Sequence, residues 1–183
     1  MKDRHQWITL AGHFVLLQLI WPAAVLGAAH GWSWPAPLVL LAMPVWSLVR
    51  GIPIERDLRM MVGGMVIGIV FEVVLIGLGL IEYAMTHGPG WVPIWILMLW
   101  GGFALNFNHC LAWLQGRWWL GAALGAFGGP ASVLVGASFG AASLPAGILP
   151  LVLFYGTAWA GVVPLLGWLA RRYREREEAG EVA

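Results

Sequence analysis

Charged residues are scarce in this sequence and make up only 10% of its 183 residues. A soluble domain carries about 25% charged residues. Hydrophobic residues reach 60%, with 13 tryptophans, so a soluble fold of this composition would expose large apolar patches to water. The scarcity of charge therefore excludes an ordinary soluble protein and predicts an integral membrane protein, whose first partner is the lipid bilayer.

Other features that the sequence lacks exclude further classes of function. The net charge of +1 and the lack of a basic stripe exclude nucleic acid as a partner. Cys110 is the only cysteine, which excludes an internal disulfide. The sequence contains no Gly-x-Ser-x-Gly elbow, no phosphate-binding glycine loop and no Cys-x-x-Cys pair. It therefore carries no complete catalytic signature and gives no reason to expect a cofactor.

Apolar runs of membrane-spanning length are what the sequence does contain, since a spanning helix needs about 20 apolar residues. We predict an all-α, polytopic bundle of six transmembrane helices that forms a single domain over residues 1–170. A polar cytoplasmic tail follows at 171–183. The predicted spans are 7–28, 32–49, 60–81, 91–114, 118–141 and 145–170.

The basic residues predict the orientation of this bundle. All ten lysines and arginines fall before the first span, between the second and third, between the fourth and fifth, or after the sixth. In a six-span arrangement these segments share one side of the membrane, and the opposite loops contain none. The positive-inside rule then places both termini in the cytoplasm. We expect the cell inner membrane of a bacterium.

Two of the spans allow a second interpretation. The first, with Lys2 and Arg4 ahead of it, has features of a cleaved signal peptide. Its apolar run of about 22 residues exceeds the usual signal core of about 7–15 residues, which favours a retained span. The fifth is interrupted by Gly128-Gly129-Pro130 and allows a re-entrant segment. One kinked helix is favoured, because packed membrane helices tolerate proline.

Small residues at spacings of three and four predict helix-packing faces, since membrane helices approach closely through them. In the third span Gly64, Gly68 and Gly79 share a face with Glu72. In the fifth span the stripe comprises Gly121, Gly125, Gly129, Gly136 and Gly140, together with Ser132.

A buried polar cluster is the candidate site. It comprises Glu72, Asn106, Gln18, His109 and His13 from three predicted spans, with Glu72, Gln18 and Asn106 at one depth. Polar groups in hydrocarbon face the bundle interior, and an intramembrane carboxyl group is a candidate for function by default. The alternative is that these side chains only hold helices together. A metal site formed by His13, His109 and Glu72 lacks the His-x-x-x-His spacing of zinc hydrolases, so no metal is expected.

The fourth span carries a family resemblance. Residues 95–104 (WILMLWGGFA), continuing through Asn106 to 111–114 (LAWL), resemble the bacterial inner-membrane family called domain of unknown function 2878. Residues 14–21 and 125–140 resemble its first and fifth spans. Glu72 stands where relatives often have Asp, and His109-Cys110 departs from a small hydroxyl residue. The resemblance implies a link to lipid metabolism, because relatives are often encoded near fatty-acid-modifying enzymes.

Three functions remain open. The first is a small transporter, or an accessory protein of lipid or fatty-acid metabolism, with other membrane or lipid-metabolism proteins as partners. The second is a membrane-embedded enzyme that uses Glu72 and His109. The third is a structural membrane partner protein without a site, which the missing motifs and the glycine faces favour.

Overall fold

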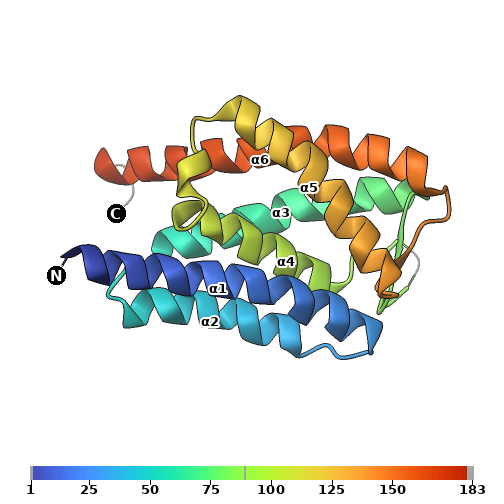
Figure 1. Cartoon of the computed structure of the whole chain (residues 1–183), viewed down its shortest axis with the longest axis horizontal. Coiled ribbons are helices and arrows are strands. Elements are labelled where there is room, and N and C mark those ends of the chain that lie inside the picture. The colour runs from blue at the N-terminus through green and yellow to red at the C-terminus, as the bar shows by residue number, and fades with distance from the viewer. Residues whose placement is uncertain (1, 89, 181–183) are drawn as a thin grey trace.

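The computed structural model describes residues 2–88 and 90–180, with side chains from residue 4 onward, and forms a helical bundle (Figure 1). The described residues contain six α-helices, as an all-α fold requires. They are α1 (Lys2–Ala29), α2 (Pro35–Val49), α3 (Glu55–Gly77), α4 (Ile94–Leu105), α5 (Trp118–Ser138) and α6 (Ile148–Glu178). Two 3-10 segments, η1 (Asn106–Asn108) and η2 (Ala112–Leu114), connect α4 to α5.

Helix length divides these elements into two groups. In the described part of the chain, four helices (α1, α3, α5 and α6) are long and apolar enough to cross a membrane. The helices α2 and α4 are apolar but have 15 and 12 residues. At a rise of about 1.5 Å per residue they cover about 22 and 18 Å, whereas the hydrocarbon core is about 30 Å thick. Each of the six helices overlaps one of the six predicted runs, and four of them are long and apolar enough to cross a membrane.

Close packing occurs where glycines face a neighbouring backbone. A Cβ atom at Gly125 on α5 would collide with the main chain of Trp159 on α6, and one at Gly64 on α3 would collide with Trp100 and Ala104 on α4. The pairs α5–α6, α3–α4 and α1–α2 pack together most extensively. Gly68, Gly129 and Gly121 lie against the side chains of Trp100, Trp159 and Val163, respectively.

The ends of two predicted spans are wrong. The helix α3 ends at Gly77, so Gly79 lies beyond it in a turn with φ of +66°. Gly140 likewise follows the end of α5 with φ of +86°. Both positions suit glycine because of this backbone conformation and not because of helix packing. Gly136 is buried, but a Cβ there would come no closer than 3.9 Å to another side chain, which is ordinary contact.

The structure also shows which of the other predicted spans form continuous helices. The helix α5 runs unbroken through Pro130, as one helix and not two half-helices. The predicted fourth span is wrong as a single helix, because α4 ends at Leu105 and the chain then turns through η1 and η2. The helix α6 continues to Glu178, so the polar tail begins as helix. Residues 181–183 of that tail lie outside the described residues.

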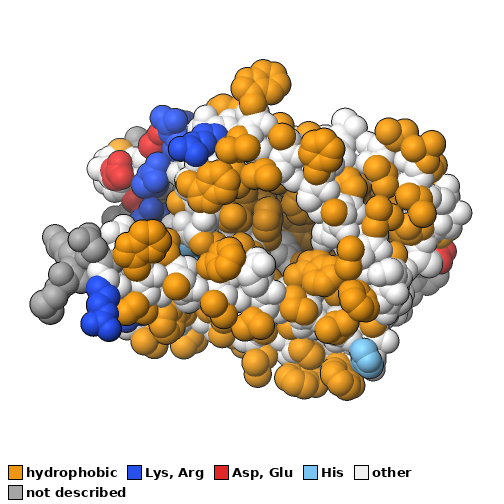
Figure 2. All heavy atoms as spheres, viewed as in Figure 1, with side chains coloured by type: hydrophobic (Ala, Val, Ile, Leu, Met, Phe, Trp, Pro, Cys, Tyr) orange, Lys and Arg blue, Asp and Glu red, His pale blue; other side chains and the backbone are white. Residues whose placement is uncertain are grey.

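The two ends of the bundle differ in character. The N- and C-terminal ends lie together at one end, where Lys and Arg side chains gather (Figures 1 and 2). Arg56 and Arg59 pair there with Glu177, at 3.2 and 3.3 Å. The α3–α4 loop contains the two-residue strand β1 (Glu82–Tyr83), and the α5–α6 loop contains β2 (Ala142–Ser143). These strands pair antiparallel and tie the two loops together.

Candidate functional site

The five predicted site residues do not form one cluster. His13 and His109 belong to a group centred on Asp57, and Glu72 belongs to a second group with Tyr83 and Trp100. Asn106 donates a 2.7 Å hydrogen bond to the Gly102 carbonyl and accepts one from the Cys110 thiol at 3.2 Å. Gln18 lines a pocket that also reaches Glu72. The prediction of one converging cluster is therefore wrong.

The Asp57 cluster joins α1, α2, α3 and the segment after α4. Both Asp57 carboxylate oxygens lie 2.9 Å from the His109 Nε2. Ser47 donates to Asp57 Oδ2 at 2.6 Å, and the Asn108 amide donates to Oδ1 at 2.9 Å. His13 Nε2 lies 3.2 Å from the Ser47 hydroxyl, and its ring stacks on that of His109 with centroids 3.5 Å apart. Several main-chain segments are thus bound to one carboxylate.

The order of these bonds indicates what the Asp57 cluster can do. Because the Ser47 proton points to Asp57, the Ser47 oxygen accepts from the Nε2–H of His13. A serine nucleophile needs the reverse, with its proton on a histidine base that a carboxylate orients. The arrangement binds helices together and does not activate Ser47.

The Glu72 cluster lies on the other half of α3, and the Glu72 side chain is 1% exposed. The Tyr83 hydroxyl donates to Glu72 Oε2 at 2.6 Å, and the Trp100 indole donates to Oε1 at 2.9 Å. Around them, Trp100 stacks on Trp159 with ring centroids 4.9 Å apart, and Tyr155 lies 6.0 Å from Trp159. Glu72 thus sits among aromatic rings, held by two neutral donors.

The two clusters are separate because α4 ends at Leu105 and the chain then turns. Trp100, the partner of Glu72, lies six residues before Asn106, which is about 9 Å along a helix. If residues 91–114 formed one helix, Asn106 would lie deeper in the bundle, farther from the end where the basic residues gather. Because the chain turns at η1, Asn106 and His109 lie near that end, where α2 meets α3.

A pocket of about 490 Å³ connects Glu72 to the side of the bundle. Its walls come from α1, α4, α5 and α6, with Glu72 of α3 among the lining residues. Figure 2 shows it as a hollow surrounded by hydrophobic side chains, in a view that looks across the helices of Figure 1. The polar lining residues include Gln18, Glu72, Ser132 and Tyr155. In the view of Figure 2 the pocket opens on the side of the bundle.

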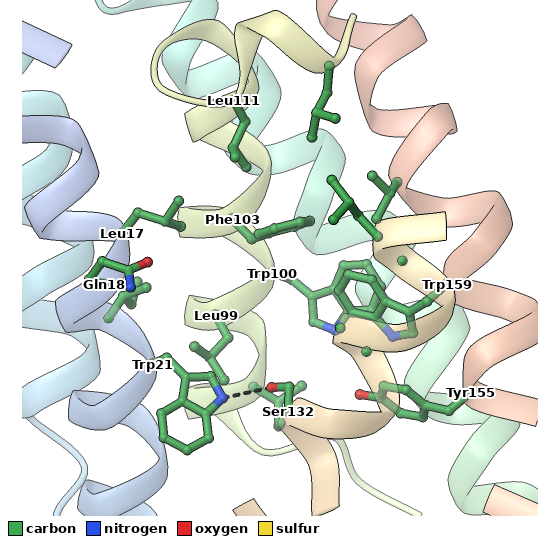
Figure 3. Close-up of a pocket in the computed structure, with 18 of the residues that line it drawn as sticks. Leu17, Gln18, Trp21, Leu99, Trp100, Phe103, Leu111, Ser132, Tyr155 and Trp159 are labelled. Atoms are coloured by element: carbon green, nitrogen blue, oxygen red, sulfur yellow. Dashed lines mark hydrogen bonds between the residues drawn. The ribbon is translucent and has the colours of Figure 1, made fainter. Parts of the chain in front are cut away.

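The pocket is bridged between α1 and α5. The Trp21 indole donates a 2.7 Å hydrogen bond to the Ser132 hydroxyl, which is the dashed line in Figure 3. Figure 3 also shows the Tyr155 hydroxyl pointing toward the same space. At Gly128, a lining residue on α5, an added Cβ would meet no atom within 4 Å. A larger side chain at Gly128 would extend into open space.

The comparison with protein families finds one family model that covers most of the chain. The model of the family described as "Protein of unknown function (DUF2878)" matches residues 10–165. The chain belongs to this family. The match spans every residue that lines the pocket and both polar clusters, so these features lie within the DUF2878 region. No curated protein and no solved structure shows a significant match.

Sequence reasoning missed several residues of this DUF2878 region. Asp57 lies in the charged connection between the second and third predicted spans, outside the runs in which site residues were sought. It is 2% exposed and continues the inward face of Gly64, Gly68 and Glu72 at helical spacing. Extending that face by two turns would have found it. Tyr83 and Tyr155 carried no such signal, because their proximity to Glu72 depends on the tertiary fold.

The chemistry that combines Glu72 and His109 finds no support in this arrangement. The two residues share no hydrogen-bond partner, and His109 is not among the residues lining the pocket. In this arrangement Glu72 and His109 therefore lie in separate clusters and do not form one catalytic pair. Among the described residues, no group of three His, Cys, Asp or Glu side chains is arranged to hold a metal ion.

Proposed function

We propose that this protein takes up an apolar or amphipathic molecule from the bilayer into its lateral pocket. It then acts as a small transporter or as an accessory protein that presents the molecule to lipid or fatty-acid metabolism. The main observation in its support is an apolar pocket of about 490 Å³ on the side of the bundle, with the buried Glu72 among its lining residues. Pockets of about 300–1,000 Å³ bury most of a small ligand.

The proposal includes the placement of the chain across a bacterial inner membrane, with six spans and both termini in the cytoplasm. The gathering of basic side chains at the end that holds both termini supports it. The short helices α2 and α4 pack along α1 and α3, and α4 continues into η1. With the helix axes across the membrane, a pocket on the side of the bundle faces acyl chains and not water.

Photo-crosslinking with a neutral probe tests this uptake. Purified protein in liposomes is irradiated with a long-chain fatty alcohol that carries a diazirine, and the labelled residues are mapped by mass spectrometry. We expect labelling at Trp21 and Leu124, which line the pocket, in addition to Phe127. Phe127 is 79% exposed on the outside of α5 and reports contact with bulk lipid.

A matched pair of glycine variants distinguishes the pocket from the lipid-facing surface. Gly128→Leu places a side chain in the pocket, whereas Gly161→Leu on α6 enters open space away from it. Gly128→Leu should abolish labelling at Trp21 and Leu124 but leave Phe127 labelled, and Gly161→Leu should change neither. Equal pocket labelling in both variants, or labelling of Phe127 alone in the wild type, would contradict the proposal and favour a structural protein.

The biological role is tested in the source organism. A deletion strain that produces Gly128→Leu should show the altered membrane lipid profile of the deletion itself, measured by lipid mass spectrometry. Gly161→Leu should restore the normal profile. Full restoration by Gly128→Leu would show that the pocket is not needed.

A further inference from the structure

We infer that the pocket binds a lipophilic organic cation, with the Glu72 carboxylate as counter-ion and the rings of Trp100, Tyr155 and Trp159 as its wall. This inference rests on the proposed function, because the cation would enter the same pocket from the bilayer. It goes further by naming the charge and the chemical class of the occupant.

The first step is that Glu72 lacks a cationic partner in the part of the chain that the structure describes. Its two contacts, the Tyr83 hydroxyl and the Trp100 indole, are neutral donors. A carboxylate accepts about four hydrogen bonds, so acceptor capacity remains. Ionised groups within a membrane pair with opposite charges or serve as counter-ions to a ligand. A bound cation would supply the missing charge.

The second step is the character of the wall. Trp100 and Trp159 are stacked with an interplanar angle of 25°, and Tyr155 and Trp159 with 22°. Figure 3 shows these three residues together on one side of the pocket. Because these rings stack on one another, they give the pocket an apolar aromatic wall that brings no positive charge near Glu72.

The third step excludes an anionic occupant. The residues that line the pocket include no Lys, Arg or His. The described basic side chains gather instead at the end of the bundle that holds the termini. A fatty-acid carboxylate would bring a second negative group beside Glu72 into a space of low polarity. Two like charges in such a space repel strongly.

The test uses two ions of the same shape. Tetraphenylphosphonium and tetraphenylborate each carry four phenyl rings but have opposite charge. Each is titrated against labelling of the pocket by the neutral diazirine alcohol, and tetraphenylphosphonium binding is also measured by calorimetry. We expect tetraphenylphosphonium to prevent labelling of Trp21 and Leu124, and tetraphenylborate to have little effect. The comparison needs no variant and so does not depend on the folding of one.

Variants then assign the effect to Glu72. Glu72→Gln should weaken tetraphenylphosphonium competition by roughly tenfold or more, because a desolvated charge pair is lost. In each variant, competition is measured relative to that variant's own labelling by the neutral alcohol. Glu82→Gln removes a carboxylate on β1 that does not line the pocket, and it should have no effect.

The outcomes separate the two claims. If the alcohol labels the pocket but the two ions compete equally, or if Glu72→Gln competes like the wild type, the cation inference is overturned and the proposed function stands. If the alcohol never labels the pocket in the wild type, both are overturned.

Discussion

Asp57 accepts hydrogen bonds from Ser47 on α2, from Asn108 in η1 and from His109 just beyond it. At 2% exposure it is a buried acceptor for three donors, which come from α2 and from the segment after α4. Removing a buried acceptor costs more than the net value of its bonds, since the donors remain without partners. Asp57 therefore fixes how the basic end of the bundle closes.

Replacing Asp57 tests this role. Asp57→Ala should lower the free energy of unfolding by about 3–5 kcal/mol, the usual cost of removing one partner from a buried pair. Asp57→Asn should cost less, because its amide oxygen still accepts. Thermal unfolding of the protein in detergent measures both. Glu55→Ala, an exposed carboxylate two residues earlier on α3, should change little. An equal loss at Glu55 would argue against the Asp57 cluster.

Residue-scale prediction from the sequence succeeded where one helix contained the evidence. Glu72 was singled out because glycines at helical spacing shared its face, and the structure buries it at 1% exposure. Its partner Tyr83 comes from a short strand after the helix, and Trp100 comes from α4. No spacing along the chain predicts such pairs, because they form only when α3, α4 and the β1–β2 connection pack together.

At the scale of elements, glycine fixes how closely α5 and α6 approach. A Cβ at Gly125 would collide with the main chain of Trp159, which cannot rotate away as a side chain can. Gly128, one turn along the same helix, meets no atom within 4 Å. The two glycines are therefore matched in helix and in residue type but not in packing.

Alanine at these two positions should act in opposite directions. Gly125→Ala should destabilise the protein by about 1–3 kcal/mol, the range for overpacking. Gly128→Ala should be neutral or stabilising by up to about 1 kcal/mol, because alanine favours helix over glycine. Thermal unfolding in detergent measures both. Equal effects at the two positions would show that the α5–α6 approach does not depend on Gly125.

The elements show a limit of sequence reasoning as well. Hydrophobicity alone predicted one helix over 91–114, yet α4 ends at Leu105. Asn108 and His109 both reach Asp57 there, which adjacent residues of a continuous helix would not do, because their side chains point in different directions. Asparagine competes with the helix by bonding to nearby groups, so these residues carry a weak signal for the break. The length and apolar character of residues 91–114 predicted a continuous helix in spite of this signal.

At the scale of the whole molecule, α2 and α4 decide the topology, because each is shorter than the bilayer core. If both cross, residue 86 lies outside the cell and residues 55 and 117 lie inside. If α2 does not cross, residue 55 lies outside. If α4 does not cross, residue 117 lies on the same side as residue 86. The number of spans therefore becomes a question about three exposed positions.

Single cysteines answer it in a Cys110→Ala background. Thr86→Cys should react with a membrane-impermeant maleimide in intact cells, whereas Glu55→Cys and Arg117→Cys should react only after permeabilisation. A green fluorescent protein fused to the C-terminus should fluoresce, because it folds in the cytoplasm. Labelling of Glu55→Cys in intact cells would remove α2 from the spans, and labelling of both Thr86→Cys and Arg117→Cys would remove α4. With either helix absent from the span count, an odd number of crossings would place the termini on opposite sides, although they lie at one end of the bundle (Figure 1). Six crossings and four crossings both keep the termini on one side, and residue 55 distinguishes them, because it lies inside only if α2 crosses.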